Sequence, residues 1–402
     1  MAYPTLEKLF HMDASPERFS ANNRLLDERL SHESTFRTGI ELEHGELFLA
    51  VPRELSMATN QVLRRERRVS ALWHDLPPIA LGAFIRSLIM DEVVASNEIE
   101  GVHSTRRQIE EALESHDPSE HTPFMEFAQL YLRLTENPLP PTSTQEIREI
   151  YDAIVAGAIS PDCLPGASTF RTGPVEIVNQ HGRTVHKGVE PAKVEQLMKQ
   201  WIDLSLSDEI PELYSSILCH FLFGYIHPFY DGNGRTGRYL LALHLSSPLS
   251  QPTALSLSRI IAENKAAYYK AFDVSERALN HSEATHFVLT MLDLITQAQE
   301  ELIVDLESKC ALIRSLEKRI QSLKGQFTPR ECETLFYAAQ MHLYHVLKET
   351  RLDKLAEHLG VSKPTARKAL APLEEHGYLE RASARPPVYR LTRKGVELLG
   401  FE

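Results

Sequence analysis

The sequence has few cysteines and no long apolar run. Its four cysteines, spread over 402 residues, form no C-x-x-C pair, which argues against a zinc knuckle or a disulfide framework. No apolar stretch approaches the roughly 20 residues that span a bilayer, and the N-terminal sequence MAYPTLEKLFHMD lacks the basic and apolar regions of a signal peptide. We therefore expect a cytoplasmic protein with no membrane partner, whose cysteines stay reduced: Cys163, Cys219, Cys310 and Cys332.

Basic side chains are also scarce relative to acidic ones. The chain has 43 Lys and Arg against 55 Asp and Glu, a formal charge of -12, which argues against nucleic-acid binding along its whole length. The balance is uneven, however, because residues 327–402 carry 12 basic and 10 acidic side chains. The length exceeds that of a usual single domain. We therefore expect two or three domains, of which the C-terminal one differs electrostatically from the rest.

The N-terminal third changes from weakly patterned to helical. Residues 1–75 are polar and contain no interpretable motif, so we treat them as an N-terminal segment ahead of a domain over residues 76–300. A helix over about residues 81–101 is predicted because apolar residues follow the spacing i, i+3, i+4, i+7 and a glycine ends it: Leu81, Phe84, Ile85, Leu88 and Gly101. Thr105 and Gln108 have the spacing of a capping box that begins the next helix.

Residues 170–190, FRTGPVEIVNQHGRTVHKGVE, have a different pattern. β-Branched residues flank the turn sequence NQHG, which predicts a β-hairpin. A hairpin on a helical domain leaves a strand edge exposed, and that edge could pair with an extended segment of another protein. The alternative is a surface hairpin that has no partner.

The middle of the chain predicts a buried helix, a loop and a second helix. Residues 212–226, ELYSSILCHFLFGYI, are apolar on nearly every side, as in a helix surrounded by protein. The glycine-rich loop HPFYDGNGRTGR follows at residues 227–238, and its end begins a segment, RTGRYLLALHL, of helical composition. A ligand of this loop would lie between the two helices.

The C-terminal part predicts a long helix and a small DNA-binding type of domain. Residues 284–325 are helical with few breaks, and we treat 301–326 as a helical linker. Its apolar stripe fits either packing against the chain's own core or the seam of a homodimer: Leu302, Leu306, Leu312, Leu316, Ile320 and Leu323. In residues 327–402, a helix, a turn at Gly360, a helix begun by Ser362 and a strand-turn-strand predict a winged helix-turn-helix.

The loop at residues 227–238 combines an imidazole, a carboxylate, glycines and two guanidiniums. The sequence DGNG is a strong turn former, so a tight capped turn alone would account for it. A helix follows at once, however, so its amide groups can converge on an anion, and Gly232 and Gly234 let phosphate approach the backbone. Arg235 and Arg238 lie on one face of the first helical turn and offer forked donors. Together these residues favour a polyphosphate ligand.

Two further side chains of the loop suit phosphate chemistry. Asp231 is a hard oxygen ligand beside the predicted phosphate site, which suits Mg²⁺ held by one carboxylate, phosphates and waters. His227 has an ordinary pKa of about 6.5 and could accept a proton at neutral pH. A base, a metal ligand and a phosphate site together indicate transfer of a phosphate-containing group to a protonated nucleophile.

The loop resembles the Fic-domain signature at every specified position: HPF, any residue, Asp or Glu, GNGR, two residues and Arg. The preceding LCHFLFGYIHPF, the hairpin and the downstream LSRIIAENKAAYYKAF are also similar to that family. The resemblance covers about residues 80–300. It implies a mainly α-helical Fic-type domain whose hairpin is a flap, followed here by the C-terminal winged helix-turn-helix. It also implies a protein adenylyltransferase, which transfers AMP from ATP to a Ser, Thr or Tyr hydroxyl of a target protein or of itself.

The functional residues of the family are carried over to the matching positions. His227 would be the general base, and Asp231 would hold Mg²⁺ or Mn²⁺. The remaining positions would bind ATP: Gly232, Asn233 and Gly234 as an anion hole, Arg235 at the α- and β-phosphates, Thr236 and Gly237 within the motif, Arg238 at the γ-phosphate, and Tyr268 or Tyr269 beside the adenine. The flap would hold the target's backbone beside His227.

The resemblance also separates two chemistries within the family. A branch that transfers phosphate and binds ATP in the reverse sense carries Ala and Lys where this chain has Gly232 and Gly234. Both glycines therefore favour nucleotidyl transfer. Since the motif contacts phosphates and not the base, other nucleotides and a phosphocholine donor remain open alternatives.

The sequence SNEIEG matches the inhibitory pattern of the same family through Ser96, Glu100 and Gly101. A serine and a glutamate four apart share a helix face; a solvated helix end is the alternative. The resemblance implies that Glu100 pairs with Arg238 at the γ-phosphate position, which leaves the α-phosphate of ATP out of line for attack. Because the pattern precedes the motif in one chain, the arrangement is of class II. Glu100 could also position water that removes AMP, as a secondary activity.

A second class of function is a DNA-binding regulator in which the Fic-like site senses a nucleotide. Basic residues of the predicted recognition helix and wing could contact phosphates: Lys363, Arg367, Lys368, Arg381 and Arg385. The excess of two positive charges is small for a DNA-binding domain, and Glu374 and Glu375 end the same helix. A winged helix used for protein contacts or dimerisation is the remaining alternative.

Overall fold

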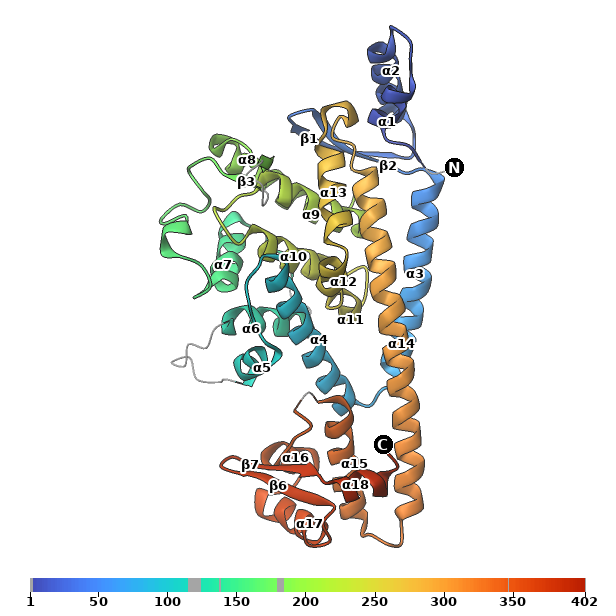
Figure 1. Ribbon diagram of the computed structural model, residues 1–402, viewed down its shortest axis with the longest axis vertical. Helices are drawn as coiled ribbons and strands as arrows, with labels where there is room; N and C mark the ends of the chain where they lie inside the picture. The colour runs from blue at the N-terminus through green and yellow to red at the C-terminus, as the bar shows by residue number, and fades with distance from the viewer. Residues whose placement is uncertain (1–2, 115–123, 137–138, 179–183, 346, 402) are drawn as a thin grey trace. The chain divides into compact units, whose positions relative to one another are not determined.

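The computed structural model of the chain is mainly helical and divides into two compact units (Figure 1). The structure describes residues 3–114, 124–136, 139–178, 184–345 and 347–401. Unit 1 comprises Met1–Arg67 and Ile89–Glu300, and unit 2 comprises Arg68–Leu88 and Glu301–Glu402. Within the described ranges, no helix is both long and apolar enough to cross a membrane.

Residues 1–67 belong to the same unit as the glycine-rich loop. They contain α1 (Leu6–Met12), α2 (Arg18–Ser31), a hairpin of β1 (Thr35–Leu42) and β2 (Gly45–Ala50), and most of α3 (Arg53–His74). The hairpin is fixed to a distant part of the chain, because Ala284 N donates to the Phe48 carbonyl (3.0 Å) and Ala50 N to Thr285 Oγ1 (3.1 Å). The sequence analysis did not predict this hairpin.

The predicted helix over about residues 81–101 is α4 (Pro78–Ile99). It begins three residues earlier than predicted, at a proline, which suits the first helical position. It ends before Gly101, whose φ of 73° is the left-handed conformation expected of a glycine beyond a helix. The next helix, α5 (Arg106–Glu114), has the predicted capping box: Gln108 N donates to Thr105 Oγ1 (3.3 Å) and Thr105 N to Gln108 Oε1 (2.9 Å).

The predicted hairpin is present. After α6 (Met125–Arg133), a short 3₁₀ turn and α7 (Thr144–Val155), strand β3 (Glu176–Val178) pairs antiparallel with β4 (Thr184–Lys187). Glu176 lies opposite Lys187, and Ile177 opposite His186. The predicted turn, residues 179–182, lies outside the described residues. We call this hairpin the flap, and α8 (Pro191–Leu206) follows it.

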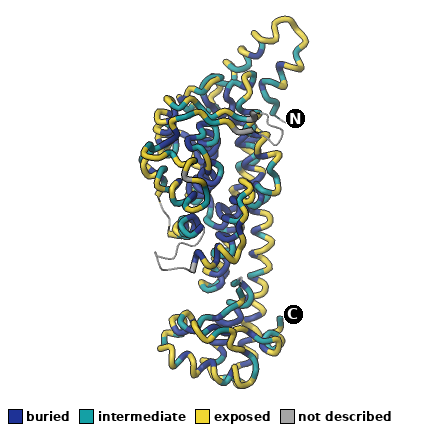
Figure 2. Tube along the Cα trace, turned by 60° about the vertical axis from the view of Figure 1, so that its left-hand side comes forward, coloured by how far each residue is buried: buried dark blue, intermediate teal, exposed yellow. Residues whose placement is uncertain are grey.

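The two helices that flank the glycine-rich loop form the centre of unit 1. α9 (Glu212–Ile226) and α10 (Asn233–Leu245) pack against each other, and nearly all of their residues are buried (Figure 2). The apolar residues on every side of α9 explain this position, since no face of such a helix suits water. Three helices follow in sequence: α11 (Gln251–Ala254), α12 (Leu257–Glu263) and α13 (Lys265–Glu276). The predicted order of buried helix, loop and helix is confirmed.

Unit 2 contains the predicted winged helix-turn-helix. The last 23 residues of α14 (Thr285–Leu323) belong to it, so the predicted linker is a continuation of that helix. The remaining elements are α15 (Pro329–Tyr344), β5 (Thr350–Arg351), α16 (Leu352–His358), α17 (Lys363–Glu375), β6 (Leu379–Ala384), β7 (Pro387–Leu391) and α18 (Arg393–Leu399). The strand order is β5-β7-β6. The leucine stripe of α14 is buried in the chain's own core except at Leu312, which is 38% exposed.

Candidate functional site

The glycine-rich loop begins where α9 ends. His227 caps this helix with a φ of 52°, and its amide N donates to the Phe223 carbonyl (3.0 Å). Two residues later, Phe229 is fully buried and stacks on Tyr151 of α7, with ring centroids 3.6 Å apart and planes 9° from parallel. The aromatic contact anchors the loop, so that the His227 side chain has a defined place at the helix end.

The imidazole of His227 is neutral over the physiological pH range. Burial lowers its pKa to about 3, and the neighbouring His186, with a ring centroid 5.8 Å away, acts in the same direction. A hydrogen bond to the Gly224 carbonyl opposes them. A neutral imidazole has one donor and one acceptor nitrogen. Because one nitrogen donates to Gly224, the other carries the lone pair that can accept a proton.

Two residues of the loop are fixed by its close packing. Gly232 has a φ of 79°, and a Cβ there would lie 2.5 Å from Val155 Cγ1, so both the conformation and the space require glycine. The Asn233 side chain braces the loop, because its Nδ2 donates to the Phe229 carbonyl (2.8 Å) and its Oδ1 accepts from Phe229 N (2.9 Å). Any contact of Asn233 with an anion is therefore left to its backbone amide.

The first turn of α10 offers backbone donors to an anion. The first intrahelical bond runs from Thr236 N to the Gly232 carbonyl (3.0 Å), and the amides of Asn233, Gly234 and Arg235 precede it. Such amides have no acceptor within their helix and lie at its positive end. Asp231, which is exposed, lies at the start of this turn.

The carboxylate of Asp231 suits a metal site in which the protein supplies a single carboxylate ligand. No group of three His, Cys, Asp or Glu side chains that could hold a metal occurs in the part of the chain that the structure describes. Mg²⁺ commonly binds through one or two carboxylates together with phosphates and waters. A single exposed carboxylate beside an anion site suits that arrangement.

Arg235 is buried with donors that have no acceptor. The residue is 1% exposed, and its Nε and Nη1 atoms lack any hydrogen-bond partner. Burial lowers the pKa of Arg235, and Asp231 and Glu100 oppose this shift. An unsatisfied buried donor on a cation is costly. The pair of free donors therefore indicates that the site is shaped for an anion.

Arg238 is hydrogen-bonded to α4 and to Glu100, the residue that follows this helix. Its Nε donates to Ser96 Oγ (3.0 Å), its Nη2 to the Ser96 carbonyl (2.8 Å) and its Nη1 to Glu100 Oε1 (2.8 Å). Burial lowers the pKa of Arg238, but the Glu100 carboxylate and nearby tyrosines outweigh it, and the net shift is upward. The ion pair lies at the rim, since the Arg238 side chain is 2% exposed and that of Glu100 is 30% exposed.

The carboxylate of Glu100 also lies on the first turn of α10. A Cβ built on Gly234 would be 1.9 Å from Glu100 Oε1 and 3.0 Å from Arg238 Nη1. The carboxylate therefore occupies the space directly over the glycine that sequence analysis assigned to an anion hole. An anion bound to the amides of this turn would meet the negative charge of Glu100.

A second carboxyl group of α4, two turns before Glu100, is fully buried. Glu92 is 1% exposed; its Oε2 accepts from Ser258 N (2.9 Å) and its Oε1 contacts Ser258 Oγ. Burial raises the pKa of Glu92 to about 7, while Ser258 and the charge of Arg238 oppose the shift. Sequence analysis missed Glu92, although its spacing of four residues from Ser96 places it on the same helix face.

Two positions of the motif, Thr236 and Gly237, pack against the protein and are not open to a ligand. The Thr236 side chain is fully buried, and its Oγ1 donates to the Gly232 carbonyl (2.9 Å). Gly237 lies against α9: a Cβ there would be 3.1 Å from Phe223 Cδ1, and its carbonyl lies 3.0 Å from His220 Nδ1. Both residues hold α10 in place, which positions the donors of the first turn.

The two candidate adenine neighbours differ in accessibility. Tyr268 is 4% exposed, and its hydroxyl lies 2.7 Å from His220 Nε2. Tyr269 is 49% exposed, and its ring centroid is 5.2 Å from that of Tyr268. Burial lowers the pKa of His220 to about 3, so its ring is neutral. Of the two tyrosines, only Tyr269 has an open face for a base to stack on.

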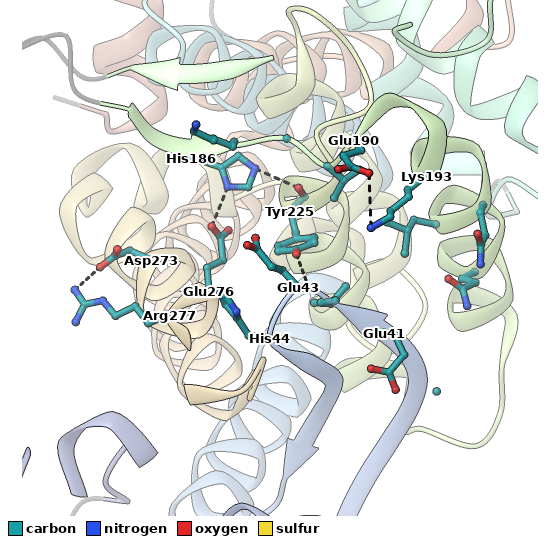
Figure 3. A pocket seen from close by; sticks show the side chains of 18 residues that line it. Glu41, Glu43, His44, His186, Glu190, Lys193, Tyr225, Asp273, Glu276 and Arg277 are labelled. Carbon is teal, nitrogen blue, oxygen red and sulfur yellow. Dashed lines mark hydrogen bonds and ion pairs between the residues drawn. The ribbon is translucent and has the colours of Figure 1, made fainter. Parts of the chain in front are cut away.

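A cavity of about 930 Å³ lies beside the foot of the flap (Figure 3). Its lining includes His186 of β4, whose Nδ1 lies 2.8 Å from Glu276 Oε2 and whose Nε2 lies 3.2 Å from the Tyr225 carbonyl. Glu41 and Glu43 of the β1–β2 hairpin line the same cavity. Sequence analysis missed this grouping, which only the fold brings together.

Known proteins match both units of the chain. The model of the Fic/DOC family matches residues 141–245, and that of the IclR helix-turn-helix domain matches residues 348–383. A Fic family protein from Desulfovibrio desulfuricans G20 is 22% identical, with a TM-score of 0.52 over 86% of this chain and 97% of that chain.

Two more solved structures have lower scores. Fic-1 from C. elegans is 17% identical, with a TM-score of 0.48 over 76% of this chain and 82% of that chain. A Fic domain containing signaling protein from Bacteroides thetaiotaomicron VPI-5482 is 17% identical, with a TM-score of 0.44 over 61% of this chain and 97% of that chain. The glycine-rich loop between α9 and α10 lies within the region that matches the Fic/DOC family, and the winged helix contains the region that matches the IclR helix-turn-helix domain.

Proposed function

We propose that this protein is a protein adenylyltransferase, which transfers AMP from ATP to a hydroxyl side chain of a target protein or of itself. The observation that carries the proposal is the pair of unpartnered, buried donors of Arg235 at the amide-rich start of α10, on the loop that begins with the neutral imidazole of His227. The match of residues 141–245 to the Fic/DOC family supports nucleotidyl transfer in general.

In the proposed reaction, His227 accepts the proton of the target hydroxyl. The hydroxyl oxygen attacks the α-phosphorus, the bond between that phosphorus and the bridging oxygen to the β-phosphate breaks, and pyrophosphate leaves. The amides of Gly234 and its neighbours and the guanidinium of Arg235 would hold the phosphates. Asp231 would hold Mg²⁺ or Mn²⁺, which would neutralise charge on the leaving pyrophosphate.

The same proposal includes inhibition by Glu100 within the chain. Arg238 is the forked cation placed to meet the γ-phosphate, yet it donates to Glu100 and to Ser96. Glu100 also covers Gly234, so that ATP would meet both a like charge and a filled volume. Misplacement of the α-phosphate by about 1 Å would be enough to slow the transfer about 100-fold.

The test compares full-length wild type with Glu100→Gly, incubated with α-labelled ATP and Mg²⁺ or Mn²⁺. We expect the variant to label itself faster, and the double variant Glu100→Gly, His227→Ala to lose the label. Glu98→Gly is the matched control, because it introduces glycine into the last turn of the same helix at an exposed position. Labelling of Glu100→Gly no faster than that of Glu98→Gly would refute inhibition by Glu100.

Mass spectrometry of the modified protein identifies the group that is transferred. An added AMP supports the adenylyltransferase, whereas another nucleotide or phosphocholine would assign a different donor to the same site. Treating the AMP-modified protein with wild type in the absence of ATP tests removal of AMP, for which Glu100 would have to position water. Lysate proteins treated with ATP and Glu100→Gly would reveal the target and its modified hydroxyl.

A DNA-binding function is a second candidate, favoured by one surface of the winged helix. Lys363, Arg367 and Lys368 of α17 are exposed, and none has an acidic partner among the described residues. Arg381 and Arg385 of the wing are exposed as well. Phosphate contacts predict that DNA retention of the full chain falls steeply as salt rises. Retention that is absent at low salt, or unchanged in Arg367→Ala, Lys368→Ala, would favour protein contacts.

A further inference from the structure

Arg171 is a buried cation whose three nitrogens all donate to backbone carbonyls. The residue is 2% exposed. Its Nε donates to His227 O (2.7 Å), its Nη1 to Gly173 O (2.8 Å), and its Nη2 to Ile226 O (3.3 Å) and to Val189 O. No carboxylate partner of Arg171 occurs in the described part of the chain. A buried cation persists when its donors are satisfied, and here four carbonyls engage four of the five N–H groups.

Two of these carbonyls are at the end of α9. The last carbonyls of a helix have no intrahelical donor and lie at its negative end, so a cation there is favourable. Ile226 is the last residue of α9, and His227 follows it with a φ of 52°, a left-handed conformation that is unfavourable for a residue with a Cβ. The guanidinium of Arg171 thus caps α9 and holds the backbone of His227 in this conformation.

The other two carbonyls belong to the two ends of the flap. Gly173 precedes β3, and Val189 follows β4. Between them, Gly188 N donates to the Val175 carbonyl (3.1 Å). A Cβ on Gly188 would lie 2.7 Å from Arg171 Nη2 and 3.2 Å from His227 Cβ. The backbone of the flap, the guanidinium and the imidazole-bearing residue are therefore in direct contact.

The hydroxyl group of Tyr230 makes a second contact between the loop and the segment that leads into the flap. Its hydroxyl oxygen accepts from Thr172 N (3.1 Å) and Gly173 N (2.8 Å). Tyr230 is the one position within HPFYDGNGR that the family signature leaves open. These bonds hold the segment directly after Arg171, so the guanidinium has little freedom to leave its four carbonyls.

We propose that Arg171 is a positioning residue that fixes the base His227 and the target-binding flap to each other through one planar side chain. The inference rests on the proposed function, because that function makes His227 the base and the flap the element that holds the target. Lysine could not replace it, since an ammonium is a single point donor, whereas the guanidinium spreads its donors over a plane.

The experiment uses full-length protein with Glu100→Gly, to which Arg171→Lys or Arg171→Met is added. Arg148→Met is the matched control, because Arg148 also donates to loop carbonyls, those of Gly166 and Ser168, but does not contact His227. Self-labelling is measured in single turnover against ATP concentration. In parallel, the His227 ring is titrated by NMR of ¹³C-labelled histidine, assigned by its loss in His227→Asn, and melting temperatures report folding.

We expect Arg171→Met to label about 100-fold more slowly than the control at saturating ATP, with half-saturation unchanged, because the base and target are misaligned while the phosphate site is intact. The titratable or charged groups that face the His227 ring are Arg171 and His186, and His186 is hydrogen-bonded to Glu276. Loss of the Arg171 charge should therefore raise the pKa of His227 and shift its NMR titration to higher pH. Arg171→Lys should keep most of that charge effect yet lose most of the rate.

Other results would overturn the inference. Labelling by Arg171→Lys and Arg171→Met at the rate of Arg148→Met would do so, as would an unchanged His227 titration in Arg171→Met. If Arg171→Met fails to fold, the labelling rate of Arg171→Lys against that of Arg148→Met decides. If the proposed function itself is wrong, no form carrying Glu100→Gly would be labelled, while the His227 titration in Arg171→Met would still report whether Arg171 acts on His227.

Discussion

Arg238 Nη1 and Glu100 Oε1 lie 2.8 Å apart in an ion pair whose two members come from α10 and from the residue directly after α4. The same guanidinium donates twice to Ser96, one turn earlier on α4. Three of the five N–H donors of Arg238 are thus engaged, one on each nitrogen. The strength of the proposed inhibition should depend on each of the three bonds, which would make it graded and open to dissection.

Ser96→Ala should release inhibition in part. The change removes the acceptor of Arg238 Nε and keeps the Ser96 carbonyl and Glu100, so the hold of α4 on Arg238 weakens by about 1–2 kcal/mol. We expect self-labelling to rise about tenfold, less than in Glu100→Gly. The control is Ser216→Ala, which removes another buried hydroxyl, one bonded to the Glu212 carbonyl. A rate equal to wild type would contradict the importance of Ser96.

Gly232→Ala should destabilise the protein more than Gly157→Ala does. Both glycines have positive φ values, 79° and 66°, which cost alanine about 1–2 kcal/mol. Only at Gly232 does the added Cβ clash, 2.5 Å from Val155 Cγ1, which adds about 1–3 kcal/mol. Urea unfolding followed by Trp201 fluorescence in a Trp73→Phe background measures the difference. Equal free energies of unfolding for the two variants would mean that the loop shifts to accommodate the added methyl group.

Arg235→Met should separate stability from nucleotide binding. The variant removes a buried guanidinium with unpaired donors, so we expect an equal or higher melting temperature without nucleotide. In the Glu100→Gly background, ATP with Mg²⁺ should raise the melting temperature of the parent but not of the Arg235→Met form. Arg107→Met, at a side chain that is 84% exposed, is the control and should retain the response to ATP. A response retained in Arg235→Met would exclude Arg235 as a phosphate ligand.

Glu92→Gln should remove a pH dependence of stability. Because burial raises the folded pKa of Glu92 to about 7 from 4.5, the protonated carboxyl favours the folded state at low pH. Between these values the unfolded chain loses its proton first, so stability falls as pH rises, by about 3 kcal/mol in all. Glutamine does not titrate, so the free energy of unfolding of the variant should rise relative to that of wild type between pH 5 and pH 8. Glu98→Gln, exposed on the same helix, should not.

The order of elements around the site could be predicted because each carries a local pattern. The apolar residues of α9, the turn formers of the loop and the capping box of α5 are all properties of short segments, and all three were predicted correctly. The β1–β2 hairpin was missed because its strands are fixed by residues far along the chain, Ala284 and Thr285. Non-local contacts of this kind leave no local periodicity.

The same distinction explains which site residues escaped prediction. Arg171 is a single arginine in FRTGPV, and nothing in that sequence indicates that it caps a helix that ends 55 residues later. His186 and Glu276 are 90 residues apart. For Asn233 and Thr236 the motif indicated the right neighbourhood, but only the fold reveals that their side chains hold the loop and the helix turn.

The space over Gly234 has a consequence for how the protein would respond to its nucleotides. The Glu100 carboxylate fills the position of a Cβ on that glycine and accepts a hydrogen bond from Arg238 Nη1. Under the proposed inhibition, a triphosphate would compete with Glu100 for Arg238 through its γ-phosphate, whereas a nucleoside diphosphate lacks that group. Binding of a triphosphate in the productive position and pairing of Glu100 with Arg238 would then be reciprocally linked. Through this competition, the ratio of tri- to diphosphate in the surrounding solution would set the fraction of molecules that are active.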